Sequence, residues 1–129
     1  MDRSEIMRRV RDRDTTPERV VRRLLREIGQ PGYRLNRKDL PGSPDIAYIG
    51  RRNAIFVHGC FWHGHDCKRG ARQPKRNAEY WRSKIERNRT RDAKANGELR
   101  ARGWRVVTIW ECELRDLDAT RRRLRDFFA

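Results

Sequence analysis

The sequence predicts an α/β fold in which a mixed central sheet is flanked by helices. Apolar segments rich in β-branched or aromatic residues predict core strands at residues 45–49, 54–58 and 104–110. Apolar side chains spaced three and four residues apart predict helices at residues 16–28, 79–102 and 117–128. A chain of 129 residues has the usual size of one domain, so we expect a single domain.

The charge of the chain points to a polyanionic partner. The formal net charge is +15, and 28 of the 33 basic residues are arginine. The guanidinium group suits phosphate oxygens and base edges, and a surplus of this size favours nucleic acid as the partner. No segment is apolar enough for a membrane span or a signal peptide, so we expect a cytoplasmic protein with no membrane partner.

The first 30 residues predict a charged arm followed by an amphipathic helix. Residues 1–14 are rich in arginine and read equally well as a solvated tail or as an arm that contacts DNA. Thr15 and Pro17 suit the start of a helix, and Gly29 suits its end. Glu18 shares the apolar side of this helix, where a carboxylate needs a partner; it either belongs to a site or interacts with the helix dipole.

The strands at residues 45–49 and 54–58 predict a hairpin. With residues 50–53 as the loop, Ile49 would pair with Ala54, and Asp45 would face His58 at the open end. A carboxylate and an imidazole placed together there suit a hydrated cation, and a hard ion such as Mg²⁺ is the better candidate at Asp45. The alternative is an exposed Asp–His pair.

Residues 57–67, V-H-G-C-F-W-H-G-H-D-C, carry the most chemistry in the chain. They contain all three histidines and two of the three cysteines, a density typical of metal and proton-transfer sites. The third cysteine, Cys112, closes the predicted strand at residues 104–110. Three thiols and one imidazole would complete a structural zinc site, with His65 favoured by its spacing from Cys67 and His63 also possible.

The helix at residues 79–102 places several side chains on one stripe. Trp81 lies on this stripe together with Ile85, Ala95 and Leu99, and Asn88 and Asp92 fall on the same side. A tryptophan in this pattern is more often a core residue than a ligand contact.

Several motifs together resemble one bacterial family. They are D-T-T-P-E at residues 14–18, L-P-G-S-P-D at 40–45, the histidine-rich segment at 57–67, R-D at 91–92 and G-W-R-V-V-T-I-W-E-C at 103–112. On these motifs the chain resembles the very-short-patch-repair (Vsr) DNA mismatch endonucleases over nearly its whole length. The resemblance implies a restriction-endonuclease-like fold of the PD-(D/E)xK type, with Pro44 and Asp45 in place.

The resemblance also implies an enzyme: a Mg²⁺-dependent hydrolase that nicks one strand 5′ to the thymine of a T:G mispair. Asp45 would be the essential Mg²⁺ ligand, and Val57 would add its backbone carbonyl. His58 and His63 would assist the attacking water and the leaving group, and Glu18 would support the site. Val57 stands where some members carry threonine, which preserves a backbone ligand but excludes a hydroxyl role.

The remaining implied roles concern zinc and DNA. The structural zinc ligands would be Cys60, His65, Cys67 and Cys112. The aromatic residues Phe61, Trp62 and Trp81 would wedge into the duplex beside the mispair, where a wobble-paired step is easier to unstack.

The partner implied by the resemblance is double-stranded DNA with a T:G mismatch, together with possible mismatch-repair proteins, and we expect a monomer. The chain ends soon after its last predicted helix, so we expect no C-terminal partner-binding extension. Two alternatives stay open. One is a nickase of the same fold with another site or modification specificity, and the other is a zinc-stapled DNA-binding module without activity.

Overall fold

The computed structural model describes residues 15–60, 63, 65, 67 and 77–129. A four-stranded sheet lies in the middle of this part of the chain, with strand order β1-β2-β3-β4. The strands are β1 (Arg34–Leu35), β2 (Ile46–Tyr48), β3 (Asn53–His58) and β4 (Arg105–Trp110). The first three run antiparallel to their neighbours, whereas β3 and β4 are parallel. The predicted mixed sheet is therefore present.

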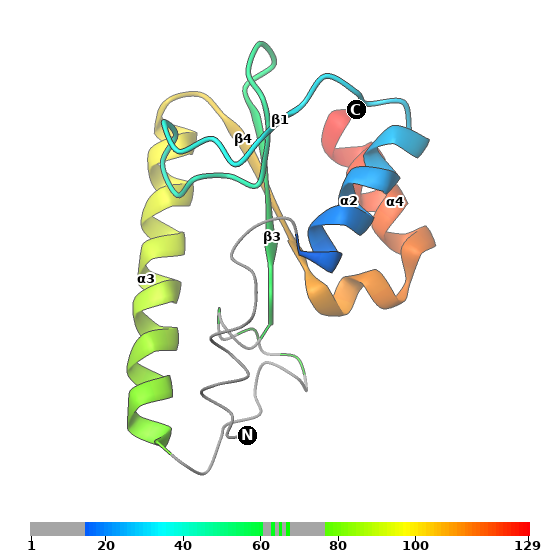
Figure 1. The fold of residues 1–129 in the computed structure, drawn as a ribbon. Coiled ribbons are helices and arrows are strands. Elements are labelled where there is room, and N and C mark those ends of the chain that lie inside the picture. The colour runs from blue at the N-terminus through cyan, green and yellow to red at the C-terminus, as the bar shows by residue number, and fades with distance from the viewer. Residues whose placement is uncertain (1–14, 61–62, 64, 66, 68–76) are drawn as a thin grey trace.

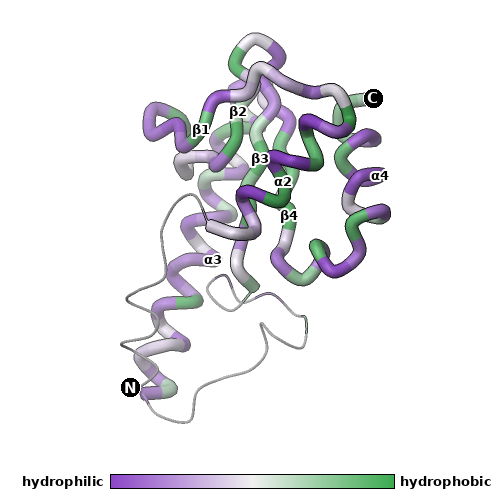
Figure 2. The backbone as a smooth tube through the Cα atoms, turned by 45° about the vertical axis from the view of Figure 1, so that its right-hand side comes forward, coloured by the Kyte–Doolittle hydropathy of each residue, from purple (hydrophilic) through white to green (hydrophobic). Residues whose placement is uncertain are grey.

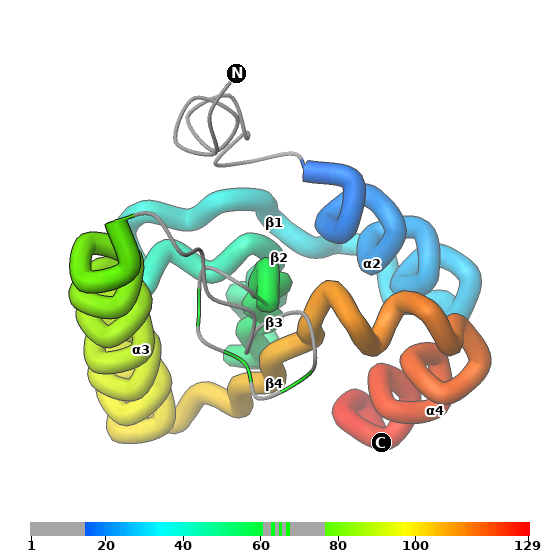
Figure 3. The backbone as a smooth tube through the Cα atoms, turned by 90° about the horizontal axis from the view of Figure 1, so that it is seen from below, coloured from blue at the N-terminus to red at the C-terminus, as the bar shows by residue number. Residues whose placement is uncertain are grey.

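The helices lie on the two faces of this sheet. The helix α3 (Ala78–Ala101) covers one face, and α2 (Thr16–Glu27) and α4 (Leu117–Phe128) lie on the other (Figures 1 and 3). A short 3₁₀ helix, η1 (Glu111–Arg115), joins β4 to α4. The parallel β3–β4 pair requires a crossover, and α3 supplies it.

The larger core lies between the sheet and the α2–α4 pair. Its fully buried members from the helices are Val21, Leu24, Leu25 and Leu124, and those from the strands are Ile46, Ile55 and Ile109. The second, smaller core lies under α3 and contains Ala54, Phe56 and Leu99. The alternation of apolar side chains along β3 supplies both cores, because successive residues of a strand point to opposite faces.

The ends of α2 follow the sequence signals. The Thr15 hydroxyl accepts a hydrogen bond from the Glu18 amide at 3.4 Å, and Pro17 occupies the first turn. Gly29 has a φ of +75°, which suits the residue that ends a helix. These local contacts fix the direction in which α2 carries Glu18.

The helix α3 is long but buries little apolar surface. Of its 24 residues, the buried ones are Trp81, Ala95 and Leu99. Figure 2 shows the rest of α3 as mostly hydrophilic. Near its C-terminal end α3 meets the loop before β2: a Cβ atom built on Gly42 would lie 2.6 Å from the Cβ of Ala95. The absence of a side chain at Gly42 therefore lets this loop pack directly on α3.

The predicted hairpin is present, but its predicted register was wrong by two residues. Tyr48 pairs with Asn53 and Ile46 with Ile55, so the register places Asp45 beside Phe56 and not opposite His58. The turn comes one residue earlier than expected: the Arg52 amide donates to the Ile49 carbonyl at 3.3 Å. Arg52 takes a left-handed φ of 57°, which allows this tight turn.

Two further expectations concern a membrane span and the N-terminal arm. No described helix is long and apolar enough to cross a membrane. The arm expected at residues 1–14 lies outside the residues that the structure describes.

Candidate active site and metal site

Two carboxylates meet where β3 ends. Glu18 on α2 is 4% exposed, and Asp45 directly precedes β2. The two carboxyl groups interact through their side chains, and Asp45 Oδ2 also accepts a hydrogen bond from the Val57 amide at 2.7 Å. The backbone of β3 therefore fixes one oxygen of Asp45, and Glu18 approaches the same carboxylate from the helix.

This arrangement disfavours the charged form of Asp45. Burial and the nearby Glu18 together raise the pKa of Asp45 to about 7, because the Val57 hydrogen bond only partly opposes them. A cation bound beside Asp45 would favour the charged form of this carboxyl group. The chemistry of this pair therefore fits a hard divalent ion.

Three side chains form a second group on the α3 side of the same strand end. Asp92 of α3 accepts a short hydrogen bond from His63, with 2.5 Å between Oδ2 and Nδ1. His58, the last residue of β3, has its Nδ1 3.9 Å from the same oxygen. Sequence reasoning did not assign Asp92 a role, although it placed Asp92 on the inward stripe of α3 and within a family motif.

The two imidazoles of this group are stacked. The ring centroids of His58 and His63 lie 3.8 Å apart, with 4° between the ring planes. A metal ion bound in plane by both rings is incompatible with this arrangement, because nitrogen lone pairs lie in the ring planes and these planes are parallel. The group of His58, His63 and Asp92 is therefore better suited to proton transfer than to metal binding.

The environments of the two histidines differ. His58 is 6% exposed, and its Nδ1 has no hydrogen-bond partner among the described residues. Burial and the neighbouring His63 together lower the pKa of His58 to about 4, and Asp92 only partly opposes the shift. His58 is thus neutral near pH 7, and His63 is oriented by a carboxylate on Nδ1, as in a His–Asp pair of a hydrolase.

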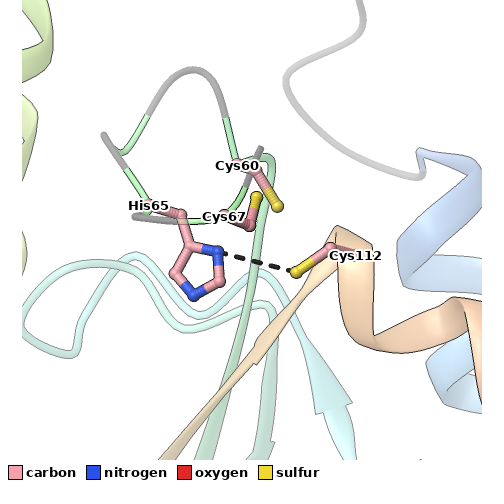
Figure 4. A group of neighbouring side chains, drawn as sticks. All are labelled: Cys60, His65, Cys67 and Cys112. Carbon is pink, nitrogen blue, oxygen red and sulfur yellow. Dashed lines mark hydrogen bonds between the residues drawn. The ribbon is translucent and has the colours of Figure 1, made fainter. Parts of the chain in front are cut away.

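The cysteines and the third histidine form a separate group. Ligand atoms of Cys60, His65, Cys67 and Cys112 all lie within 4.8 Å of one another. Figure 4 shows the four side chains converging from the segment after β3 and from η1, with Cys112 Sγ 3.5 Å from His65 Nδ1. The amide of His65 donates to the Cys60 carbonyl at 3.0 Å, so these two residues also meet through the backbone.

Without a cation, the buried thiol of this group is difficult to deprotonate. Burial, together with the neighbouring thiols of Cys67 and Cys112, raises the pKa of Cys60 to about 12. Three sulfurs and one imidazole nitrogen are one of the donor sets that zinc prefers in closed tetrahedral sites. The donor set therefore fits Zn²⁺, which would stabilise the thiolate forms.

Of the three aromatic residues expected to wedge into the duplex, the structure describes Trp81. Trp81 is 5% exposed and its ring contacts that of Tyr80. Phe61 and Trp62 lie outside the described residues. Their wedge role, like that of Trp81, stays a prediction.

Comparison with known proteins agrees with these motifs. Residues 1–69 match the family model described as DNA mismatch endonuclease Vsr. The chain is 53% identical over 121 residues to the type II nicking enzyme V.XorIIP of Xanthomonas oryzae pv. oryzae, covering 94% of this chain and 88% of that protein.

Two further relatives are more distant. The type II nicking enzyme V.NmeAIP of Neisseria meningitidis is 41% identical, with 95% of this chain and 86% of the relative covered. The DNA mismatch endonuclease Vsr of Escherichia coli is also 41% identical, with 88% and 71% covered. These matches confirm the resemblance found in the motifs, and the chain belongs to the Vsr family of DNA endonucleases.

Proposed function

We propose that this endonuclease hydrolyses one strand of a DNA duplex on the 5′ side of the thymine in a T:G mispair, with Mg²⁺ at Asp45. One observation carries the catalytic part of the proposal. The paired carboxyl groups of Glu18 and Asp45 and the group of His58, His63 and Asp92 flank the same end of β3. A cation site beside a proton-transfer site suits the hydrolysis of a phosphodiester.

The proposed Mg²⁺ ligands are Asp45 and the carbonyl of Val57. In an extended strand the N–H and C=O of one residue point to the same edge. Because the Val57 amide donates to Asp45, the Val57 carbonyl belongs to the same side of β3 as that carboxylate. When bound there, Mg²⁺ would lower the pKa of a coordinated water and neutralise charge on the scissile phosphate.

The chain's own residues would supply the proton transfers. His63 keeps Nδ1 on Asp92, so Nε2 is the nitrogen available to exchange a proton with water or with the leaving oxygen. His58 is neutral near pH 7 and stacks on His63, which limits the orientations open to both rings. Glu18 would hold the Asp45 carboxylate in place and share its cation.

The PD-(D/E)xK assignment is part of the proposal. Pro44 and Asp45 provide the first half of that signature, ahead of β2. The strand β3 has the sequence N-A-I-F-V-H and contains neither a carboxylate nor a lysine. We infer that the Val57 carbonyl and His58 occupy the places of the second half.

Zinc would have a structural role. Cys60, His65, Cys67 and Cys112 would fill all four positions of a tetrahedral site and leave none open for a substrate. Such an ion would join the segment after β3 to η1 after β4. We therefore assign it to holding the active-site segment in shape and not to the reaction.

Two features support DNA with a mispair as the substrate. The net charge of +15 suits binding to phosphates, and α3 exposes many of its basic side chains, among them Arg82, Arg87, Arg89 and Arg91. Phe61, Trp62 and Trp81 are the aromatic residues that we propose to contact the unstacked step at the mispair.

A second candidate function has its own support. Several relatives, including the most similar of those described above, carry the name type II nicking enzyme. A nickase that acts in a different flanking sequence would use the same active site. The two candidates differ in which duplex is cut and not in how.

The test is a panel of end-labelled duplexes that carry T:G, other mispairs or no mispair, incubated with and without Mg²⁺. We expect one nick 5′ to the mispaired thymine, only with Mg²⁺, and none by Asp45→Asn despite T:G binding. Asp39→Asn, at an exposed carboxylate on the same loop, should nick like the parent. Equal nicking of matched duplexes would favour the second candidate, and no cleavage of any duplex would refute both.

A further inference from the structure

Trp110 lies between the two histidine groups of the molecule. Its ring is stacked on that of the proposed metal ligand His65, with centroids 4.2 Å apart and 15° between the planes. The same ring meets His58 at 5.2 Å and 74° and His63 at 6.2 Å and 71°. One indole therefore contacts all three histidines of the chain.

The distances between ring centroids show where the indole lies relative to the stacked His58 and His63 rings. The His58 and His63 centroids are 3.8 Å apart, yet their distances to Trp110 differ by only 1.0 Å (6.2 Å against 5.2 Å). Trp110 consequently stands beside the histidine stack and not on its axis. It is nearly perpendicular to both catalytic rings and nearly parallel to His65, so it forms a common wall of the two sites.

The strand pairing explains this position. Trp110 is the last residue of β4 and pairs in parallel register with His58, the last residue of β3. Two residues later, η1 carries Cys112 to within 3.5 Å of His65 Nδ1. The same short segment thus supplies a metal donor and the ring that His65 rests on, while its strand partner supplies a catalytic histidine.

We propose that Trp110 is a positioning residue through which the metal-bound orientation of His65 fixes the orientation of the His58–His63 pair. This inference rests on the proposed function of both sites. A planar ring packed against His65 transmits any tilt of that imidazole, because close-packed aromatic side chains have little freedom to move separately. Removing the indole would leave the zinc ligands and Asp92 in place but release the catalytic rings from their wall.

The test compares three variants at saturating zinc and a T:G duplex. Trp110→Met retains bulk without a ring, Trp110→Phe retains a ring, and Trp104→Met is the matched control. Trp104 directly precedes the first residue of β4, whereas Trp110 is the last residue of that strand. Trp104 packs against the smaller core, away from the histidines. Zinc content per chain, thermal stability, kcat and KM are measured for each.

We expect Trp110→Met to retain one zinc per chain and its KM but to lose about tenfold or more in kcat. Trp110→Phe should recover most of that loss. Trp104→Met should lower the melting temperature and leave the kcat of folded, zinc-loaded protein unchanged. A kcat for Trp110→Met equal to that of Trp104→Met would overturn the proposal and leave Trp110 as a packing residue.

A second measurement does not depend on catalysis or on the folding of a variant. The chain has three histidines, so ring-labelled protein gives three sets of imidazole NMR signals. Replacing Zn²⁺ by Cd²⁺ should shift His58 and His63 as well as His65 in the parent and in Trp110→Phe. A shift confined to His65 in the parent would overturn the coupling. Absence of nicking by the parent would instead refute the proposed function.

Discussion

Replacing Asp45 with asparagine should stabilise the metal-free protein at alkaline pH while abolishing its proposed activity. Burial and the nearby Glu18 raise the pKa of Asp45 from its ordinary 3.8 to about 7. Between these values the folded protein holds a proton that the unfolded chain has released, so this contribution to stability is full below pH 4 and is lost as the pH rises through 7.

The size of the effect follows from the shift. A change of about 3 pKa units corresponds to about 4 kcal/mol at most between the two protonation states. Asp45 is partly exposed, so water screens part of the repulsion, and we expect a measured loss of about 1–2 kcal/mol between pH 5 and pH 8. Asparagine removes this loss and retains an oxygen that can accept the Val57 hydrogen bond.

The assay is equilibrium urea unfolding at pH 5, 6, 7 and 8, in buffers freed of Mg²⁺ by a resin and not by a chelator that would also remove zinc. Mg²⁺ at ten times its Kd should restore about 1.4 kcal/mol to the parent at pH 8 and nothing to Asp45→Asn. Asp39→Asn is the control, because Arg37 lowers the pKa of Asp39 below its ordinary 3.8, so Asp39 stays ionised from pH 5 to pH 8 and its replacement should leave the pH dependence of stability unchanged. A parent whose stability is flat from pH 5 to pH 8 would refute the reasoning.

Three further predictions concern the other groups. His65→Ala should release zinc and lower the melting temperature, whereas His63→Ala should retain the ion; metal analysis of the purified variants distinguishes them, and equal zinc contents would contradict the ligand assignment. Asp92→Asn should slow single-turnover nicking by about 100-fold with unchanged zinc and DNA affinity, because His63 loses the carboxylate that orients it; parental rates would exclude that role. Binding measured at several salt concentrations should weaken steeply as salt rises, and Trp62→Ala should lower preference for T:G over matched duplex more than it lowers overall affinity; equal losses would argue against a wedge.

The helices and strands were largely predictable from the sequence because their signals are local. The apolar spacing along α2 and α4 and the β-branched run in β4 depend on few residues, and the structure has these elements within a few residues of their predicted bounds. The grouping of Cys112 with Cys60, Cys67 and His65 was also predictable, since zinc chemistry limits which donors can combine.

The contacts that the sequence did not reveal depend on exact geometry. The hairpin register was missed because one residue of difference in the turn shifts every pair, and Arg52 gives no strong sign of its left-handed φ. The contact of Trp110 with His58 arises from the parallel pairing of β3 with β4, which are separated by the whole of α3, and the stacking of His63 on His58 accompanies its hydrogen bond to Asp92 of α3. No spacing in the sequence encodes such contacts.

The contact of Gly42 with α3 has a genetic consequence. Gly42 has a φ of +74° and lies three residues before Asp45, on the loop that meets Ala95. Any side chain there would be strained in its own backbone and would also push this loop off the helix, carrying the carboxylate with it. A screen for inactive alleles should therefore recover substitutions at Gly42, and suppressors should be rare, because Ala95 opposite already has almost the smallest side chain available.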